Sequence, residues 1–342
     1  MKKVALIGVG VIGKERLKGI QLLQNTGRKI DLVGIYDPLN SDVKKIAEEY
    51  KTKSFFNLSE ILETDLDWVF VATPHDVIID LLPQILKRGH KILVEKPLGR
   101  SVAEAKKLID FTIYPDQLWV GFNYRFFDGI STAICDLKQE KFGSLISLSF
   151  ILGHGGNPEM RESWKLDPIR AGGGCLIDPG IHLLDLCRLI LNGSPKVSSG
   201  LSWHRFWNTG IEEECHLLLE KDETVISLQI SIVRWRSTFT MQINGTDGYG
   251  IVSGRNRSYG NQTYVRGKRW GWLSGKSQKE SEELVLETNG NDVFAKEIDA
   301  LLFPSEKLLL KPCSAQEALL NMNLLEDCLK TLNIEKEVSK KH

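Results

Sequence analysis

The sequence has no excess of charge of either sign, because 44 lysines and arginines balance 44 aspartates and glutamates. A chain without a net field does not attract nucleic acid or an anionic membrane surface, so this balance argues against both kinds of partner. Nor does any apolar run approach the roughly 18 to 20 residues that a membrane-spanning helix needs. We expect neither a nucleic-acid-binding protein nor a membrane protein.

Paired cysteines are missing as well, because the six cysteines are scattered and form no C-x-x-C motif. In a chain of 342 residues this indicates reduced thiols, and not a disulfide framework or a zinc site. The basic start Met1-Lys2-Lys3 leads through apolar residues into Gly13-Lys14-Glu15-Arg16 without the small-residue cleavage site of a signal peptide. We expect a cytoplasmic protein, long enough for two domains.

Short apolar runs rich in valine and isoleucine alternate with helical patterns over the first 124 residues. The runs are Val4–Val9, Ile30–Tyr36, Trp68–Ala72, Lys91–Val94 and Leu118–Gly121. Such runs are typical of strands that are buried on both faces of a parallel sheet. Their alternation with helices predicts a doubly wound α/β domain over residues 1–124.

Longer strands with partial alternation follow, and they predict a second α/β domain over residues 125–335. We expect these strands at Phe142–Leu152, Val197–Phe206, Cys215–Val233 and Thr238–Val252, with a hairpin turn at 221–224. They suit a mainly antiparallel open sheet that shows one face to helices and the other to solvent or a partner subunit. A helix with apolar residues from Ala318 to Leu332 could pack back on the first domain, and Lys336–His342 reads as a frayed tail.

The strongest local motif is Gly8-Val9-Gly10-Val11-Ile12-Gly13, between the first strand and a helical pattern. Glycines here permit a tight turn, close approach of a pyrophosphate, and close packing of helix on strand, while the helix N-terminus binds the phosphates. The alternative is a purely structural turn. Asp37, at the end of the second run, is placed to bind a ribose hydroxyl pair and would repel a 2′-phosphate. This favours NAD over NADP without excluding NADP.

Glu95-Lys96-Pro97 follows the run Lys91–Val94, at the carboxyl edge where an open α/β sheet binds ligands. A lysine there can bind a substrate hydroxyl and stabilise the developing alkoxide as a hydride leaves. A surface lysine that merely ends a strand is the competing interpretation.

A third motif runs from Gly172-Gly173-Gly174 to Asp178-Pro179-Gly180-Ile181-His182. We expect Pro179 to begin a helix with Asp178 as its N-cap, and His182 to lie one turn in, on the same side. Imidazole accepts a proton well near neutral pH, and the carboxylate could orient it or bind substrate. The competing interpretation is a cap and a core histidine. A metal site of Asp178, His182 and Asp185 is disfavoured, because no other ligand cluster supports it.

The order of these motifs, with Ala72-Thr73-Pro74 between them, resembles the glucose–fructose oxidoreductase and inositol dehydrogenase (GFO/IDH/MocA) family, from residue 3 to about 250. The resemblance implies an N-terminal Rossmann domain and a C-terminal α/β domain whose open sheet makes a homodimer or homotetramer. It implies Lys96, Asp178 and His182 as catalytic residues and a cis Lys96–Pro97 bond. The residues that match the family's cofactor contacts are Gly10, Val11, Ile12, Asp37, Thr73, Pro74, Glu95 and Asn123, and we expect Gly8, Gly13 and Lys96 to contact the cofactor as well.

Two further positions, Arg125 and Lys165, match a region that borders substrate in the family, beside Lys96, Asp178 and His182. The chain departs from the family where relatives often carry a histidine four residues after the proline of Ala-Thr-Pro. Here that position is Ile78, and His75 follows Pro74 directly. We include His75 among the expected cofactor contacts, although this loop could approach the nicotinamide differently.

The least family-like stretch runs from Gly254 to Gly260 and continues to Arg266, Lys268, Arg269 and Trp270. Clustered arginines could clamp a phosphate or nucleotide, and the substrate would then be a sugar phosphate or nucleotide sugar. A solvated or oligomer-facing loop is the competing interpretation.

Together these features predict an NAD(P)-dependent oxidoreductase acting on a CH–OH group of a sugar, cyclic polyol, sugar phosphate or nucleotide sugar. Two other classes stay open: an NAD-dependent glycoside hydrolase, and a non-catalytic NAD-binding regulator on the same fold. A regulator would be expected to lack the lysine or the histidine, and both are present.

Overall fold

The computed structural model describes residues 1–290, 292–306, 308 and 310–334, so the predicted tail Lys336–His342 lies outside it. The chain divides into two compact units. The first comprises Met1–Asn123 and Asp292–Met322, and the second comprises residues 124–290 and 323–334 of the described part. In that part, no helix has both the length and the apolar character needed to cross a bilayer.

The first unit is built on a seven-stranded sheet of order β15-β6-β5-β4-β1-β2-β3. The strands are β1 (Lys2–Ile7), β2 (Ile30–Tyr36), β3 (Lys53–Ser54), β4 (Trp68–Val71), β5 (Lys91–Glu95), β6 (Leu118–Gly121) and β15 (Cys313–Ser314). All pairings are parallel except that of β15 with β6. The five predicted apolar runs all form strands. Strands β3 and β15 were missed because two residues are too short to carry a pattern.

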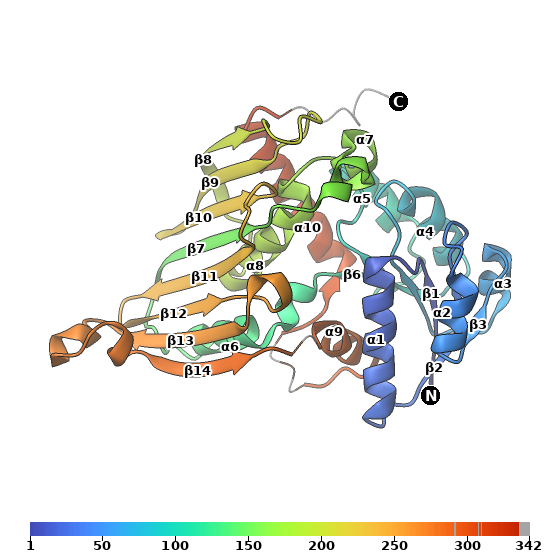
Figure 1. Ribbon diagram of the computed structural model, residues 1–342, viewed down its shortest axis with the longest axis horizontal. Coiled ribbons are helices and arrows are strands. Elements are labelled where there is room, and N and C mark those ends of the chain that lie inside the picture. The colour runs from blue at the N-terminus through green and yellow to red at the C-terminus, as the bar shows by residue number, and fades with distance from the viewer. Residues whose placement is uncertain (291, 307, 309, 335–342) are drawn as a thin grey trace. The chain divides into compact units, whose positions relative to one another are not determined.

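Helices follow the strands of this unit, as Figure 1 shows, which confirms the predicted Rossmann fold. They are α1 (Val11–Asn25), α2 (Val43–Glu49), α3 (Leu58–Glu63), α4 (Ile78–Leu86), α5 (Val102–Asp110) and α9 (Val293–Leu302), and the unit boundary falls within α10 (Ala315–Thr331). Strand β4 is buried at every residue, as expected between two helical layers. Helix α9 packs on α1, where Gly19 admits the backbone of Phe294 and Ala295.

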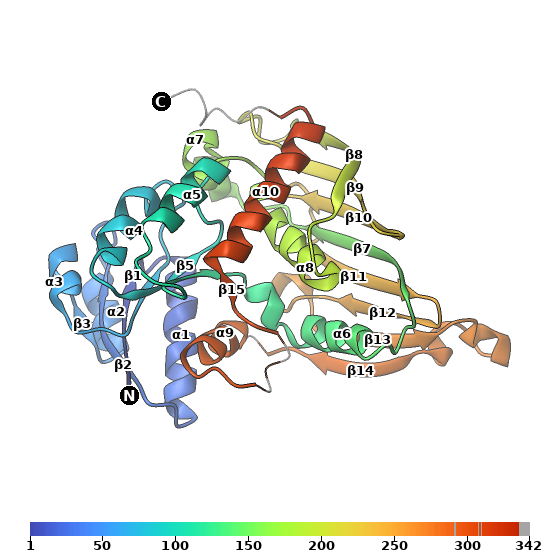
Figure 2. The same ribbon diagram turned by 180° about the vertical axis from the view of Figure 1, so that it is seen from behind.

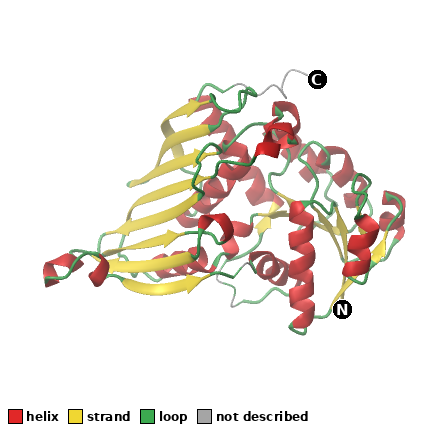
Figure 3. Ribbon diagram, in the orientation of Figure 1, coloured by secondary structure: helices red, strands yellow, loops and turns green. Residues whose placement is uncertain are grey.

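The second unit is built on a large sheet whose strands are yellow in Figure 3. It has eight strands in the order β14-β13-β12-β11-β7-β10-β9-β8. Its strands are β7 (Leu145–Gly153), β8 (Lys196–Trp203), β9 (Glu214–Lys221), β10 (Thr224–Ser231), β11 (Thr238–Gly245), β12 (Gly248–Ser253), β13 (Gln262–Lys268) and β14 (Glu283–Thr288). Strands β7 and β10 are parallel and the other pairings are antiparallel, so the prediction of a mainly antiparallel sheet is confirmed.

One face of this sheet carries helices α6 (Asp128–Lys138) and α8 (Ile181–Leu191), as Figure 2 shows from behind. The opposite face exposes apolar side chains, among them Leu201, Leu218 and Val225. Singly exposed apolar residues are normal, but a row of them on one sheet face is typical of a surface that binds something. The homo-oligomer expected through this sheet stays a prediction.

One strand prediction in this unit is wrong, and two strands were missed. The turn between Lys221 and Thr224 exists as predicted, but Thr238–Val252 is not one strand, because the chain reverses between Gly245 and Gly248. Gly245 is required there, since a Cβ would lie 2.1 Å from the carbonyl oxygen of Phe142. Strands β13 and β14 were missed because their sequences lack a clean apolar alternation.

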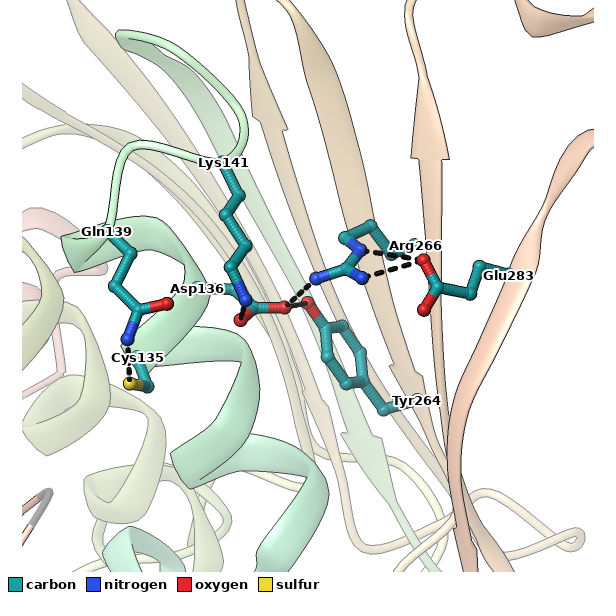
Figure 4. A network of polar contacts seen from close by, with 7 residues as sticks. All are labelled: Cys135, Asp136, Gln139, Lys141, Tyr264, Arg266 and Glu283. Atoms are coloured by element: carbon teal, nitrogen blue, oxygen red, sulfur yellow. Dashed lines mark hydrogen bonds and ion pairs between the residues drawn. The ribbon is translucent and has the colours of Figure 1, made fainter.

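A buried carboxylate joins α6 to the edge of this sheet (Figure 4). Asp136 accepts hydrogen bonds from the hydroxyl of Tyr264 at 2.7 Å, from Nη1 of Arg266 at 2.9 Å and from Nζ of Lys141 at 2.6 Å. Burial acts to raise the pKa of Asp136, but the bonds from Lys141 and Tyr264 outweigh it, and the pKa is lowered. Because Arg266 also pairs with Glu283, this arginine of the predicted phosphate clamp is used in the fold.

We predict that Asp136→Asn lowers the free energy of unfolding by about 2–3 kcal/mol at pH 7, because Arg266 and Tyr264 lose a buried charged partner. Urea unfolding measures this value. Since the pKa of Asp136 is lowered by folding, its contribution is present above the unfolded pKa of about 3.9 and is lost as the pH falls through the folded value. Glu283→Gln, at a side chain 61% exposed, is the control and costs less than about 1 kcal/mol. Equal losses in the two variants would contradict this account.

Candidate functional site

The glycine loop joins β1 to α1, and its three glycines have different surroundings. A Cβ on Gly8, which has φ +88°, would lie 2.4 Å from the carbonyl oxygen of Ala72, and one on Gly13 would lie 2.0 Å from that of Gly8. These two glycines are required by the fold itself. A Cβ on Gly10 would meet no atom within 4 Å, so space is left beside the loop at that position.

The start of α1 is suited to bind an anion. Its N-cap, Gly10, makes no side-chain hydrogen bond to the first turn, and that turn contains no acidic residue. The free N–H groups and the positive end of the helix dipole are therefore uncompensated. Val11 and Ile12, 76% and 38% exposed, are apolar side chains left open beside them.

Asp37 follows β2 and holds the glycine loop. Its Oδ2 accepts a hydrogen bond from the backbone N–H of Val9 at 2.9 Å, and its Oδ1 accepts from those of Leu39 and Asn40. Asn40 donates in turn to the carbonyl oxygen of Val9 at 3.3 Å. The carboxylate lies at the carboxyl edge of the sheet, where it can accept from a ribose hydroxyl pair and repel a 2′-phosphate.

Two buried polar atoms at the same edge have no hydrogen-bond partner among the described residues: Oγ1 of Thr73, after β4, and Oδ1 of Asn123, after β6. Such atoms are costly to bury unless a ligand pairs with them. His75, 5% exposed, lies two residues after Thr73. With the space at Gly10 and the free start of α1, these residues fit a dinucleotide cofactor.

Glu95 is bound within the fold by Arg16, and its expected contact with the cofactor stays a prediction. Its Oε1 accepts from Nε of Arg16 at 2.8 Å, and Nη1 of Arg16 binds Glu297 of α9 at 2.5 Å. Arg16 is 1% exposed. Burial acts to lower its pKa, but the two carboxylates more than offset this, so the pKa is raised. Arg16 thus fixes the end of β5, directly before Lys96. The Lys96–Pro97 bond is cis, as predicted.

In the second unit, His182 stacks on Tyr124 with ring centroids 3.9 Å apart and planes at 10°. His182 is the second residue of α8, and it is 5% exposed. The predicted N-cap is wrong: α8 begins at Ile181, and Asp178 has extended backbone angles before a cis bond to Pro179. Released from a capping role, the Asp178 carboxylate is available to other partners.

Lys165 is one of those partners, because its Nζ lies 2.8 Å from Oδ2 of Asp178. The negative charge of Asp178 is the main cause that raises the pKa of Lys165. His154, directly after β7, is close enough for the charges of Asp178, Lys165 and Arg255 to act on it, and burial is the main reason that its pKa is lowered. The predicted residues Asp178 and Lys165 are thus brought together. The segment that carries Lys165 also borders an open cavity of about 360 Å³, with Arg161, Arg170 and Thr209 in its lining.

Arg125 is placed elsewhere. It is 2% exposed, and its Nε and Nη2 bind the two oxygens of Asp185 at 2.8 and 2.6 Å. This bidentate pair joins the segment after Asn123 to α8, which carries His182. The expected role beside substrate stays a prediction, but the charge of Arg125 is accounted for by Asp185.

Sequence reasoning missed three residues of this cluster: Tyr124, His154 and Tyr259. Tyr124 stacks on His182, and both tyrosines pack against the guanidinium of Arg255. No motif marks His154. Tyr124 lies between two residues of the family pattern, Asn123 and Arg125, and Tyr259 lies within the arginine-rich stretch from Gly254 to Gly260, so the sequence carried a signal for both tyrosines.

Comparisons with known proteins agree with this geometry. Residues 2–122 match the family model described as an oxidoreductase family with an NAD-binding Rossmann fold, and residues 136–250 match the GFO/IDH/MocA C-terminal domain. The chain belongs to the GFO/IDH/MocA family. The resemblance drawn from its motifs is therefore confirmed.

Individual relatives are distant. Glucose-6-phosphate 3-dehydrogenase of Bacillus subtilis is 27% identical over 194 residues, which are 54% of this chain and 53% of the relative. The chain spans about half the length of the curated relatives it matches. Aldose-aldose oxidoreductase of Caulobacter crescentus, complexed with glycerol, has the same fold with a TM-score of 0.78 at 17% identity, over 97% of both chains. GenD2 from gentamicin A biosynthesis, in complex with NAD, has a TM-score of 0.74 at 20% identity, over 97% of this chain and 94% of that one.

We predict that Gly10→Ala leaves the melting temperature unchanged but weakens NAD binding about tenfold or more, because the new methyl group occupies space that only a ligand would need. Calorimetric titration with NAD measures the affinity. Gly13→Ala serves as the contrast, since its Cβ meets the backbone of Gly8, and it costs about 1–3 kcal/mol of stability. A destabilised Gly10→Ala variant would contradict this assignment.

We predict that Arg16→Met lowers the free energy of unfolding by about 3–5 kcal/mol, because two carboxylates then remain without their buried cation. Arg28→Met is the matched control: Arg28 also pairs with a carboxylate of α9, Asp299, but it is 46% exposed, so the loss is below about 1 kcal/mol. Urea unfolding of both variants provides the comparison. Equal losses in the two variants would show that the buried network of Arg16, Glu95 and Glu297 stabilises the protein no more than an exposed ion pair does.

Proposed function

We propose that this protein is an NAD(P)-dependent oxidoreductase that oxidises or reduces a CH–OH carbon of a sugar-like substrate. The single observation that carries the proposal is the cluster of Asp178, Lys165 and the stacked pair His182–Tyr124, in a chain whose first unit is a family-matched nicotinamide-binding domain. The family membership supports this reaction class, and the names of the relatives support sugars and their derivatives as substrates.

The chemistry divides among the residues of the chain. When bound, the cofactor supplies the nicotinamide that exchanges the hydride. His182 takes the hydroxyl proton during oxidation, and its stacking on Tyr124 restricts the orientation of the imidazole. Lys96 stabilises the negative charge that develops on the oxygen. Asp178 accepts a hydrogen bond from substrate or orients the imidazole, with Lys165 holding the carboxylate.

Cofactor choice is part of the proposal. The Asp37 carboxylate lies at the end of β2 and is oriented by three backbone N–H groups. Its charge opposes a 2′-phosphate and can accept from the hydroxyls of an unphosphorylated ribose. We therefore propose NAD as the preferred coenzyme.

We predict turnover with NAD in an absorbance screen of polyols, hexoses, hexose phosphates and nucleotide sugars, with a lower rate when NADP replaces NAD. Lys96→Met and His182→Gln are each expected to lower kcat by about 10²-fold or more, since charge stabilisation and proton transfer act only in the reaction. NAD affinity, measured by calorimetry, changes by less than about threefold in both variants, because the glycine loop and Asp37 are unaltered.

Lys91→Met, at the amino end of β5, is the matched control and keeps full activity. Tight NAD binding without turnover of any compound would overturn the proposal and favour a regulator. Glycosidic cleavage without net coenzyme consumption would favour the hydrolase instead.

A further inference from the structure

Arg255 lies in a loop that is built to hold it. The loop follows β12, and Gly254 before it has φ +75° and no room for a Cβ, which would lie 2.0 Å from the carbonyl oxygen of Asn261. Asn256 after it is 3% exposed, donates to the carbonyl oxygen of Gly290, and accepts from the backbone N–H of Gln262 at 3.1 Å. These contacts on both sides of Arg255 fix the position of its backbone.

The guanidinium of Arg255 lies over aromatic rings. Its carbon lies 4.1 Å from the ring centroid of Tyr259 and 4.9 Å from that of Tyr124, and Phe127 follows at 6.0 Å. Arg255 also forms a side-chain hydrogen bond with Tyr259. A guanidinium carries five N–H donors in one plane, so it has others to offer a ligand. The Nε of Arg255 is buried and has no hydrogen-bond partner among the described residues.

Lys165 and Arg255 are two cations near one carboxylate. The charge of Asp178 acts on Arg255, and Asp178 also forms an ion pair with Lys165 at 2.8 Å. The pKa of the next ionisable group, His154, is lowered mainly by burial; the charge of Asp178 acts to raise it, and the charges of Lys165 and Arg255 act to lower it. Arg125 is paired separately with Asp185. A ligand that brings a negative charge is therefore favoured beside Arg255.

Of the arginine-rich stretch from residue 254 to 270, this leaves Arg255 as the member near the catalytic candidates. Arg266 pairs with Asp136 and Glu283, and Arg269 donates to the carbonyl oxygen of Thr246 while stacking on Trp270. The predicted clamp thus loses Arg266 and Arg269, and Arg255 is the member that lies next to Tyr124, the ring on which His182 stacks.

We propose that the substrate carries an oxyanion, as a carboxylate or a phosphate ester, and that the in-plane N–H groups of Arg255 bind it. The fork of N–H donors on a guanidinium matches two oxygens of such a group, and a charged hydrogen bond is about twice as strong as a neutral one. A neutral polyol would offer no charged partner to the buried Nε of Arg255, which has no hydrogen-bond partner among the described residues. This inference rests on the proposed function and names the substrate class for the same site.

The test compares three probes that differ in charge: D-glucose, D-glucuronate and D-glucose 6-phosphate, each with saturating NAD. We expect kcat/KM to be higher for one of the charged probes than for glucose. Arg255→Gln lowers kcat/KM for that probe by about 10- to 100-fold and changes the value for glucose by less than about threefold. The probe that suffers the loss identifies carboxylate or phosphate as the group bound.

Arg257→Gln is the matched control, because it removes the same charge from an exposed position in the same loop. Its kcat/KM for the charged probe changes by less than about threefold. Arg255→Lys keeps the charge but loses the fork, and an intermediate loss is expected. Preference for glucose, or the same loss on charged and neutral probes, overturns the inference while leaving the oxidoreductase function intact.

Two further measurements keep the outcome independent of turnover and of the folding of any one variant. The first is calorimetry on Lys96→Met with NAD present, which measures binding alone. If a charged probe binds and the additional substitution Arg255→Gln abolishes this binding, the anion site is upheld even if no compound is oxidised. Failure of both charged probes to bind overturns it.

The second measurement uses the unaltered protein. Raising the salt concentration from about 20 to 200 mM weakens binding of the charged probe and leaves binding of glucose unchanged. Equal salt dependence also counts against the inference.

Discussion

The arginine of α1, Arg16, is the contact on which the arrangement of the first unit depends. It joins three segments through two carboxylates: α1 with its glycine loop, the end of β5 before Lys96, and α9, 281 residues away in sequence. A fully buried cation is tolerable only when its partners are in place, and the partners are tolerable only with the cation. Phe294 packs against the guanidinium, so the apolar surroundings reinforce the same geometry. The triad thus fixes α1, with its cofactor-binding loop, and the end of β5 as parts of one buried network.

Two ion pairs of the second unit differ in how deeply they are buried. Arg125 and Asp185 are 2% and 1% exposed and bind each other bidentately, which ties the start of the unit to α8. Lys165 and Asp178 are 47% and 16% exposed and are joined by one contact. The first pair is too deep and too well satisfied to exchange partners. The second can do so at modest cost, because water compensates for part of what is lost.

Glycine serves opposite purposes at three positions of one loop. Gly8 and Gly13 are there because backbone oxygens stand where a side chain would be, whereas Gly10 has open space around it. The motif pattern does not distinguish these roles, since the letters are the same. Only the positions of Ala72 and Gly8 around the turn reveal which glycines serve the fold and which one leaves room for a ligand.

The sequence by itself determined the local parts of this protein: the buried strands of the Rossmann sheet, the glycine loop, the acidic end of β2, and the motifs that identify the family. These follow from short-range patterns of apolar spacing and turn chemistry, which need no knowledge of distant contacts. What the tertiary structure decided are the partners of the charged residues. Glu95 is bound by Arg16 and Arg125 by Asp185, Asp178 is not a helix cap, and Arg255 packs against Tyr124 and Tyr259. Each of these pairings joins side chains that are brought together by the packing of separate elements or by a local break in the backbone. The sequence around a charged residue does not show which opposite charge or aromatic ring it will contact.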